Sequence, residues 1–299
     1  MRVLVTGASG PIGAALLPSL RAKGMEVVRT SRHAAAPIAS ERVIQWDPAQ
    51  PIAPEAVSGM DAVVHLAGES IVGRWNPAKK KAIHDSRVGG MSNLVMALAG
   101  AAAKPRVLIC ASAIGYYGDR DDEIMRETNP PGTGFLPEVC VDYEVAASVA
   151  ATAGIRTVML RIGIVLSPTG GALGKMLLPF KLGLGGRLGS GKQWMSWVDV
   201  EDLVGAMHHA MATESLAGPV NGVAPNPVTN TEFTRTLAGV LHRPAIFPVP
   251  AFGARLLMGE MAEALLLASQ RVIPDKLTAS GYKFRFPELR GSLERLLKA

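Results

Sequence analysis

The chain has 299 residues, 48% of them hydrophobic, enough for one large domain or for a main domain with a smaller lobe. Its net charge of +6 is modest and dispersed, and its two cysteines are too few for a disulfide framework or a metal cluster. No apolar run reaches the roughly 18 residues of a membrane span, and no signal peptide pattern opens the chain. We therefore expect a cytoplasmic protein in a reducing compartment, with no membrane partner.

The first thirteen residues read M-R-V-L-V-T-G-A-S-G-P-I-G, an apolar run that leads into Gly7, Gly10 and Gly13. A helical stretch, Ala14 to Lys23, follows. This order of strand, glycine turn and helix is typical of a dinucleotide-binding site, although ordinary turns also contain glycine. In such a site Gly7 permits the tight turn, Gly10 permits the approach of a pyrophosphate, and Gly13 lets the helix pack on the strand.

Strand-like and helix-like segments then alternate through the first half of the chain. The expected strands are Glu26–Thr30, Val43–Trp46, Asp61–Leu66, Arg106–Ala111 and Arg156–Arg161, and the expected helices are Pro77–Ala103 and Pro137–Ala153. Such alternation predicts an α/β fold of the Rossmann type, a doubly wound parallel sheet with helices on both faces. Ligands of this architecture bind outside the carboxyl ends of the strands.

The segment after the second expected strand bears on the choice of cofactor. NAD sites usually place Asp or Glu about twenty residues beyond the glycine turn, where it holds the ribose 2′-hydroxyl. Here Ser31 and Arg32 occupy that place, and no acidic residue occurs before Glu41. A guanidinium can pair with a 2′-phosphate through two hydrogen bonds. We therefore expect NADP(H), the alternative being that Arg32 is an ordinary surface residue.

The next two expected strands end in residues suited to a ligand site. The fourth ends in H-L-A-G, whose small residues let a cofactor lie against the backbone; its His65 is expected in the core, because no second metal ligand stands near it. Arg87, on the following helix, is a candidate to reach the cofactor. Beyond the fifth strand, Ser112, Tyr116 and Tyr117 lie where a substrate would meet a nicotinamide. Local hydrogen bonding for the serine and packing for the tyrosines are the alternatives.

The second half is expected to form a smaller mixed lobe, residues 166–299, while residues 1–165 form the NADP-binding domain, to which later segments return. Residues 163–193 are rich in glycine and are interpreted as irregular structure, either closing over a ligand or connecting along the surface. The polar and aromatic residues that follow are candidates to line a substrate pocket, and core packing is the alternative for the two tryptophans. They are Gln193, Trp194, Ser196 and Trp197.

Three further helices are expected in this half. One runs to Met211 with Asp199 or Asp202 as its cap, and one spans Thr231–Leu241 with Asn230 or Thr231 as its cap. A third, Phe252–Ala268, carries many Leu and Met residues, which either pack on the lobe or contact a partner.

The motifs together resemble an extended short-chain dehydrogenase/reductase, and more closely its atypical epimerase-like branch. Members of that branch are often described as nucleoside-diphosphate-sugar epimerases or cell-division-inhibitor-like proteins. The resemblance spans essentially the whole chain. It rests on T-G-A-S-G-P-I-G at residues 6–13, H-L-A-G at 65–68, D-S-R-V at 85–88, S-A-I-G-Y-Y-G at 112–118, R-I-G-I-V-L-S at 161–167, G-L-G-G-R-L-G-S-G-K-Q at 183–193, S-W-V-D-V-E-D at 196–202, N-G-V-A-P at 221–225 and R-V-I-P at 271–274.

The resemblance implies a Rossmann domain and a C-terminal lobe that closes over the substrate. It also implies that Ser112 polarises a substrate oxygen. The cofactor-binding residues that it implies are Gly7, Ser9, Gly10, Pro11, Ile12, Gly13, Ser31, Arg32, Leu66, Ala67, Gly68, Arg87 and Val165.

One departure from this family concerns its catalytic pair. Typical members carry Tyr-x-x-x-Lys on the helix after the fifth strand, where the lysine lowers the pKa of the tyrosine. Here Cys140 and Glu144 stand in those places, and a carboxylate would raise that pKa instead. The candidate replacements are Glu144 as general base and Tyr116 or Tyr117 as proton donor. Nothing near Cys140 in the sequence would generate a thiolate.

We therefore expect an NADP(H)-dependent oxidoreductase or epimerase acting on a small molecule, with a nucleotide sugar as the leading candidate. The alternative is a regulator or redox sensor that binds the cofactor and has lost the chemistry, which the missing catalytic pair favours. No nucleic-acid partner is expected, because the basic run Lys79–Lys81 is interpreted as a solvated helix face. The oligomeric state is left open, with a homodimer among the alternatives.

Overall fold

The computed structural model describes residues 1–33, 42–168 and 170–298. Its centre is a seven-stranded sheet in the order β11-β7-β5-β4-β1-β2-β3, and every neighbouring pair is parallel. The strands are β1 (Arg2–Thr6), β2 (Glu26–Ser31), β3 (Arg42–Gln45), β4 (Ala62–His65), β5 (Val107–Ala113), β7 (Arg156–Ile162) and β11 (Gly218–Gly222). The strand order reverses between β1 and β4, and a crevice at such a point is where this architecture binds ligands.

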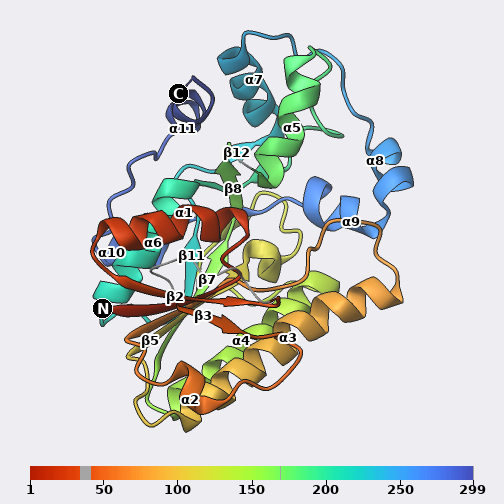
Figure 1. Ribbon diagram of the computed structural model, residues 1–299. Coiled ribbons are helices and arrows are strands. Elements are labelled where there is room, and N and C mark those ends of the chain that lie inside the picture. The colour runs from red at the N-terminus through yellow and green to blue at the C-terminus, as the bar shows by residue number, and fades with distance from the viewer. Residues whose placement is uncertain (34–41, 169, 299) are drawn as a thin grey trace.

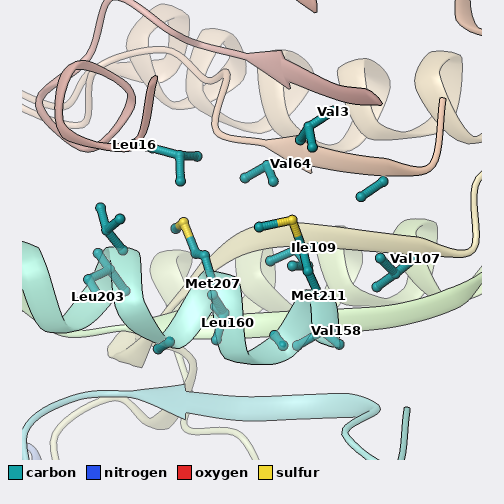
Figure 2. Close-up of a cluster of buried hydrophobic side chains, with 14 of the residues drawn as sticks. Val3, Leu16, Val64, Val107, Ile109, Val158, Leu160, Leu203, Met207 and Met211 are labelled. Atoms are coloured by element: carbon teal, nitrogen blue, oxygen red, sulfur yellow. The ribbon is translucent and has the colours of Figure 1, made fainter. Parts of the chain in front are cut away.

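Helices cover both faces of the sheet (Figure 1). On one face lie α1 (Pro11–Ala22) and α6 (Val200–Ala212), and on the other lie α2 (Pro54–Val57), α3 (Pro77–Gly100) and α4 (Phe135–Thr152). Each face has its own buried apolar cluster. Figure 2 shows the first of these, in which Leu16 of α1 and Met207 of α6 meet strand residues such as Val3 and Val64. The expected doubly wound parallel sheet is confirmed.

The remaining elements build the smaller lobe and its connections. β8 (Ile164–Ser167) pairs with β10 (Trp197–Asp199), β9 (Trp194–Met195) with β12 (Val228–Thr229), and β13 (Arg271–Val272) with β6 (Ile124–Met125). The helical elements are η1 (Ile114–Tyr117), α5 (Gly171–Lys181), α7 (Asn230–Leu241), α8 (Ala251–Met258), α9 (Glu260–Ala262), the π-helical turn η2 (Glu263–Leu267), α10 (Asp275–Ala279) and α11 (Leu289–Lys298). The division at residue 165 stays a prediction, and β11 and α6 return to the main body after it.

Two expectations about the lobe are wrong. Residues 163–193 are not irregular throughout: they contain β8 and α5, and α5 forms because it buries Leu173 and Phe180 despite its glycines. The single helix expected over Phe252–Ala268 is broken after α8, because Gly259 has a left-handed φ of +61° that ends the helix.

Of the two expected helix caps, one is correct and the other is wrong. Asp199, one of the two alternatives, caps α6 by accepting a hydrogen bond from the backbone N–H of Glu201 at 2.8 Å. For α7 both alternatives are wrong, because Thr229 is the cap and forms a reciprocal capping box with Glu232.

The expected helix face of lysines is present on α3. Each of its three lysines pairs with a carboxylate: Lys79 with Glu69, Lys80 with Glu260 and Lys81 with Asp85. The second pair joins α3 to α9 of the lobe. Within the described ranges no helix combines the length and apolar character needed to cross a bilayer.

Candidate functional site

The glycine turn between β1 and α1 is closely packed. Gly7 has a φ of +66°, and a Cβ there would lie 2.5 Å from the carbonyl carbon of Leu66. A Cβ at Gly13 would lie 2.6 Å from the Cα of Ala8. Only glycine fits both positions, so the end of β4 and the first turn of α1 are drawn against the turn. The first N–H groups of α1 lack intrahelical partners, which suits an anion.

A buried threonine fixes the end of β4 against β1. The hydroxyl oxygen of Thr6 accepts hydrogen bonds from the backbone N–H groups of Leu66 at 3.2 Å and Ala67 at 3.3 Å. The same hydroxyl lies 2.8 Å from Nδ1 of His65. Burial, assisted by the charge of Arg87, lowers the pKa of His65 to about 4. His65 is therefore a neutral core residue, as expected.

A pocket of about 260 Å³ opens at the carboxyl ends of β4, β5 and β7. It is lined by Ile12, Leu66, Ala67, Gly68, Arg87, Ala111, Ser112, Ala113, Val139, Cys140, Tyr143, Ile162 and Gly163. Five of the expected cofactor residues and Ser112 are among them, so the structure brings the glycine-turn helix and the expected substrate position to one cavity.

Several lining residues were not predicted. Val139 and Tyr143 come from α4, Ile162 is the last residue of β7, and Gly163 follows it. In the structure, a Cβ at Gly163 would lie 2.4 Å from the carbonyl oxygen of Ser196, so only glycine fits there. The glycine itself was the signal in the sequence. A glycine at the end of a strand often marks such a close backbone approach.

The expected 2′-phosphate residues lie at the end of β2. Ser31 donates its hydroxyl to the carbonyl oxygen of His33 at 2.8 Å, and Arg32 is exposed. The pKa of the Glu69 carboxyl is lowered, chiefly by its hydrogen bond to Lys79 and in smaller part by the charge of Arg32.

The other expected cofactor residues occupy three places. Gly10 precedes α1 as its N-cap, Pro11 is the first helical residue, and Ser9 is exposed in the turn. Arg87 donates from Nη1 to the carbonyl oxygen of Glu69 at 2.9 Å, and its burial lowers its pKa. Val165 packs against the main core rather than lining the pocket.

Behind the pocket wall, Ser112 belongs to a buried ionic cluster. Its hydroxyl donates to Oε1 of Glu144 at 2.7 Å. Arg161 donates from Nε to the same oxygen at 2.8 Å and from Nη2 to Oε2 at 2.7 Å. Glu144 does not line the pocket, and both of its oxygens are engaged. The structure thus joins Ser112 to Glu144 but places the carboxylate one layer behind the cavity.

The two tyrosines that follow β5 pack on the same arginine. The Arg161 guanidinium carbon lies 3.4 Å from the centre of the Tyr116 ring. The Tyr117 hydroxyl accepts from Arg161 at 3.0 Å and donates to Asn221 at 2.7 Å, while burial raises the pKa of Tyr117 to about 12. Neither tyrosine lines the pocket, so their position does not support the expected role of proton donor.

Cys140, which stands where the family's tyrosine does, lines the pocket as a thiol. Its Sγ lies 3.8 Å from the carbonyl oxygen of Ala113. Burial, with a contribution from the Glu144 charge, raises the pKa of Cys140 to about 12. Burial also raises the pKa of Tyr143 well above its ordinary value. Both groups therefore keep their protons at neutral pH.

The polar and aromatic residues 193–197 lie outside the pocket. Trp197 is buried, and its indole N–H donates to the carbonyl oxygen of Asn226 at 3.1 Å. The Ser196 hydroxyl accepts from the backbone N–H of Val272 at 2.8 Å. These residues attach the C-terminal segment to the lobe. Trp197 packs in the core, as the packing alternative has it, whereas Trp194 is half-buried and donates its indole N–H to Asp122 at 2.8 Å. Among the residues that the structure describes, no cluster of His, Cys, Asp and Glu is arranged to hold a metal ion.

Comparison with known proteins matches residues 3–221 to the NAD dependent epimerase/dehydratase family and residues 249–296 to a domain of unknown function, DUF1731. An epimerase family protein of Mycobacterium bovis is 43% identical over 284 residues, covering 94% of this chain and 93% of that protein. The crystal structure of human epimerase family protein SDR39U1 with NADPH has a TM-score of 0.91 at 35% identity, covering 100% of this chain and 99% of that chain.

A nucleoside-diphosphate sugar epimerase from Corynebacterium glutamicum has a TM-score of 0.82 at 35% identity, covering 99% of this chain and 58% of that one. These matches confirm the resemblance to the epimerase-like branch of the extended short-chain dehydrogenases. The chain belongs to the NAD dependent epimerase/dehydratase family.

Proposed function

We propose that this protein binds NADP(H) in the crevice between β1 and β4 and acts with it on a small molecule held beside Ser112. The observation that carries the proposal is the continuity of one pocket from Ile12, on the first turn of α1, past Leu66–Gly68 to Ser112. The NADPH in the human relative, at 35% identity, supports the choice of cofactor. When bound, NADP(H) supplies or accepts a hydride.

The residues present fit such a cofactor. Gly7 lets the end of β4 approach the turn, because a Cβ there would meet the Leu66 backbone, and the free N–H groups at the start of α1 suit a pyrophosphate. Ser31 and Arg32, at the end of β2, would hold the 2′-phosphate that distinguishes NADP(H) from NAD. The half-buried cation of Arg87 adds positive charge to the wall.

The chain's own residues would bind and orient the substrate. Ser112 is the hydroxyl residue of the pocket, and Glu144 with Arg161 holds it in place. Apolar residues such as Val139 and Ile162 limit the access of water to this end. The name of the relative from Corynebacterium supports a nucleotide sugar as substrate, with epimerisation or oxidoreduction as the reaction.

A second candidate function is a regulator or redox sensor that binds NADP(H) without turnover. It is favoured by the composition of the pocket wall, where burial keeps Cys140 and Tyr143 protonated at neutral pH. The carboxylate of Glu144, the expected base, is bound through both oxygens to Arg161 and Ser112. For either function, the cytoplasmic location and the oligomeric state remain predictions.

The two functions separate in one experiment. The protein is loaded with NADPH or NADP⁺ and incubated with a panel of UDP-, dTDP- and GDP-sugars, while products are followed by NMR and the cofactor by absorbance. Turnover by the wild type that Ser112→Ala abolishes, with NADPH affinity changed less than about twofold, supports the enzyme. NADPH binding without turnover of any sugar supports the regulator. A protein that binds neither NADPH nor NADP⁺ contradicts both.

A further inference from the structure

The hydroxyl of Ser112 has a fixed hydrogen-bonding direction. A serine hydroxyl offers one hydrogen and two lone pairs, whereas an ionised carboxylate can only accept. In the 2.7 Å contact between Ser112 Oγ and Glu144 Oε1, the hydrogen therefore belongs to the serine and is directed at the carboxylate. Ser112 then faces the pocket with lone pairs alone.

The Arg161 guanidinium pairs with Glu144 through two hydrogen bonds and holds it in place. Arg161 is only 2% exposed and donates to both carboxylate oxygens. Its remaining contacts fix it as well: Nη1 donates to the Tyr117 hydroxyl at 3.0 Å and to the carbonyl oxygen of Glu127 at 3.3 Å, and its face lies on the Tyr116 ring. Burial lowers the pKa of Arg161, but its bond and charge interaction with Glu144 outweigh this effect and raise it overall.

A buried pair of this kind resists rearrangement. Turning Glu144 away from Ser112 would leave a charged guanidinium in the interior without its bidentate partner, which is costly. The serine has no comparable alternative acceptor within the pair, because Arg161 only donates. The direction of the Ser112 hydrogen is therefore set by the layer behind the pocket rather than by the ligand.

We infer that Ser112 acts as a hydrogen-bond acceptor toward the ligand, and that the pocket selects a ligand hydroxyl over a carbonyl at this point. Glu144 and Arg161 are the positioning residues of this selection. A ligand hydroxyl can donate its hydrogen to Ser112 Oγ. A ligand carbonyl oxygen has no hydrogen to donate, so its lone pairs would repel those of Ser112 Oγ. This inference rests on the proposed function of the pocket as the substrate site. It differs from the expectation that Ser112 polarises a substrate oxygen, which requires that the serine donate its hydrogen.

Matched small alcohols and ketones test this inference without knowledge of the natural substrate. Cyclohexanol with cyclohexanone, and propan-2-ol with acetone, are titrated into the full chain by ligand-detected NMR, with and without NADPH. We expect each alcohol to bind about fivefold more tightly than its ketone, the effect of one hydrogen bond. An equal or greater affinity for the ketones, or no binding by either alcohol, overturns the inference.

Two variants assign the preference to these residues. Ser112→Ala should bring the ratio of alcohol to ketone affinity to about one, while the control Ser92→Ala, whose hydroxyl bonds within α3 to Val88, leaves it unchanged. The double variant E144M/R161M frees the Ser112 hydrogen and should also bring the ratio to about one. A preference that survives in Ser112→Ala overturns the inference even if the double variant does not fold.

Calorimetric titration of NADPH on the same samples keeps this result separate from the proposed function. Failure of NADPH to bind counts against the function of the pocket as a cofactor site. The alcohol-to-ketone ratio, measured also without cofactor, tests the direction of the Ser112 hydrogen bond by itself.

Discussion

The two ends of the pocket are built in different ways. At the end formed by β1, α1 and β4, the chain positions its groups through local backbone geometry, with Gly7 at a φ of +66° and Pro11 as the first residue of α1. At the end formed by β5, α4 and β7, it does so through a buried ion pair between Glu144 and Arg161, which lie on different elements.

This difference decides how each end responds to change. A local turn depends on the identity of one or two glycines, so its disturbance should stay near the cofactor. A buried ion pair depends on both partners at once, because either partner alone is an uncompensated charge in the interior. The serine end should therefore tolerate single substitutions less well than the glycine end.

The largest effect is expected from Arg161→Met. The variant leaves the Glu144 carboxylate buried without its guanidinium, and we expect a loss of about 4 kcal/mol in the free energy of unfolding, measured in urea. The double variant E144M/R161M removes both charges and should lie within about 1 kcal/mol of the wild type. If Arg161→Met is as stable as E144M/R161M, leaving the Glu144 carboxylate without its partner costs no stability, and this account of the pair is wrong.

His65, buried at the end of β4 between the two ends of the pocket, should give the next largest effect, through pH. Its pKa is about 4 in the folded protein against an ordinary 6.5, so the unfolded chain takes up a proton first as the pH falls. The contribution of His65 to the free energy of unfolding, about 3 kcal/mol, is fully present above pH 6.5 and is lost as the pH falls through 4.

Urea unfolding of His65→Asn across this range checks the assignment. Between pH 4 and 6.5, the slope of the free energy of unfolding against pH should fall in the variant by the amount that corresponds to about one proton. His33→Asn, at an exposed position, is the control and should keep the slope of the wild type. An unchanged slope in His65→Asn would rule out this histidine as the source.

A smaller effect is expected at the glycine turn from Gly7→Ala. Both Gly7 and Gly24 have positive φ values, +66° and +70°, but only at Gly7 would a Cβ meet backbone atoms of the neighbouring strand. We expect Gly7→Ala to cost about 2 kcal/mol more than Gly24→Ala in thermal or urea unfolding. Equal costs for the two variants would mean that the close approach to Leu66 carries no energy.

The sequence predicted the glycine end far better than the serine end. Patterns within a few residues were enough to predict most of that end. They gave the strand, turn and helix of residues 1–22, the core role of His65 and the lining residues Leu66–Gly68. Apolar runs also predicted α3, α4 and six of the seven strands of the sheet, because their residues are buried in the two apolar clusters. The seventh strand, β11, was not predicted.

The serine end depends on contacts between residues far apart in the chain. Glu144 was recognised as a replacement for the family's lysine, but its partner Arg161 lies in a strand that reads as apolar. Nothing in the local pattern shows that this arginine turns toward α4. The cap at Thr229 differs from the prediction for a local reason, since neighbouring residues were equally suitable as caps. The break after Met258 differs because Gly259 adopts a positive φ within a run of helix-forming residues.

The measurement that tests the account most directly is calorimetric titration with NADPH and NADH of the wild type and of Arg32→Ala. The account predicts tighter binding of NADPH than of NADH, and a loss of about tenfold in NADPH affinity in the variant with NADH affinity unchanged, because only the 2′-phosphate contact is removed. If the wild type binds neither cofactor, the glycine turn is architecture alone and the central claim is wrong.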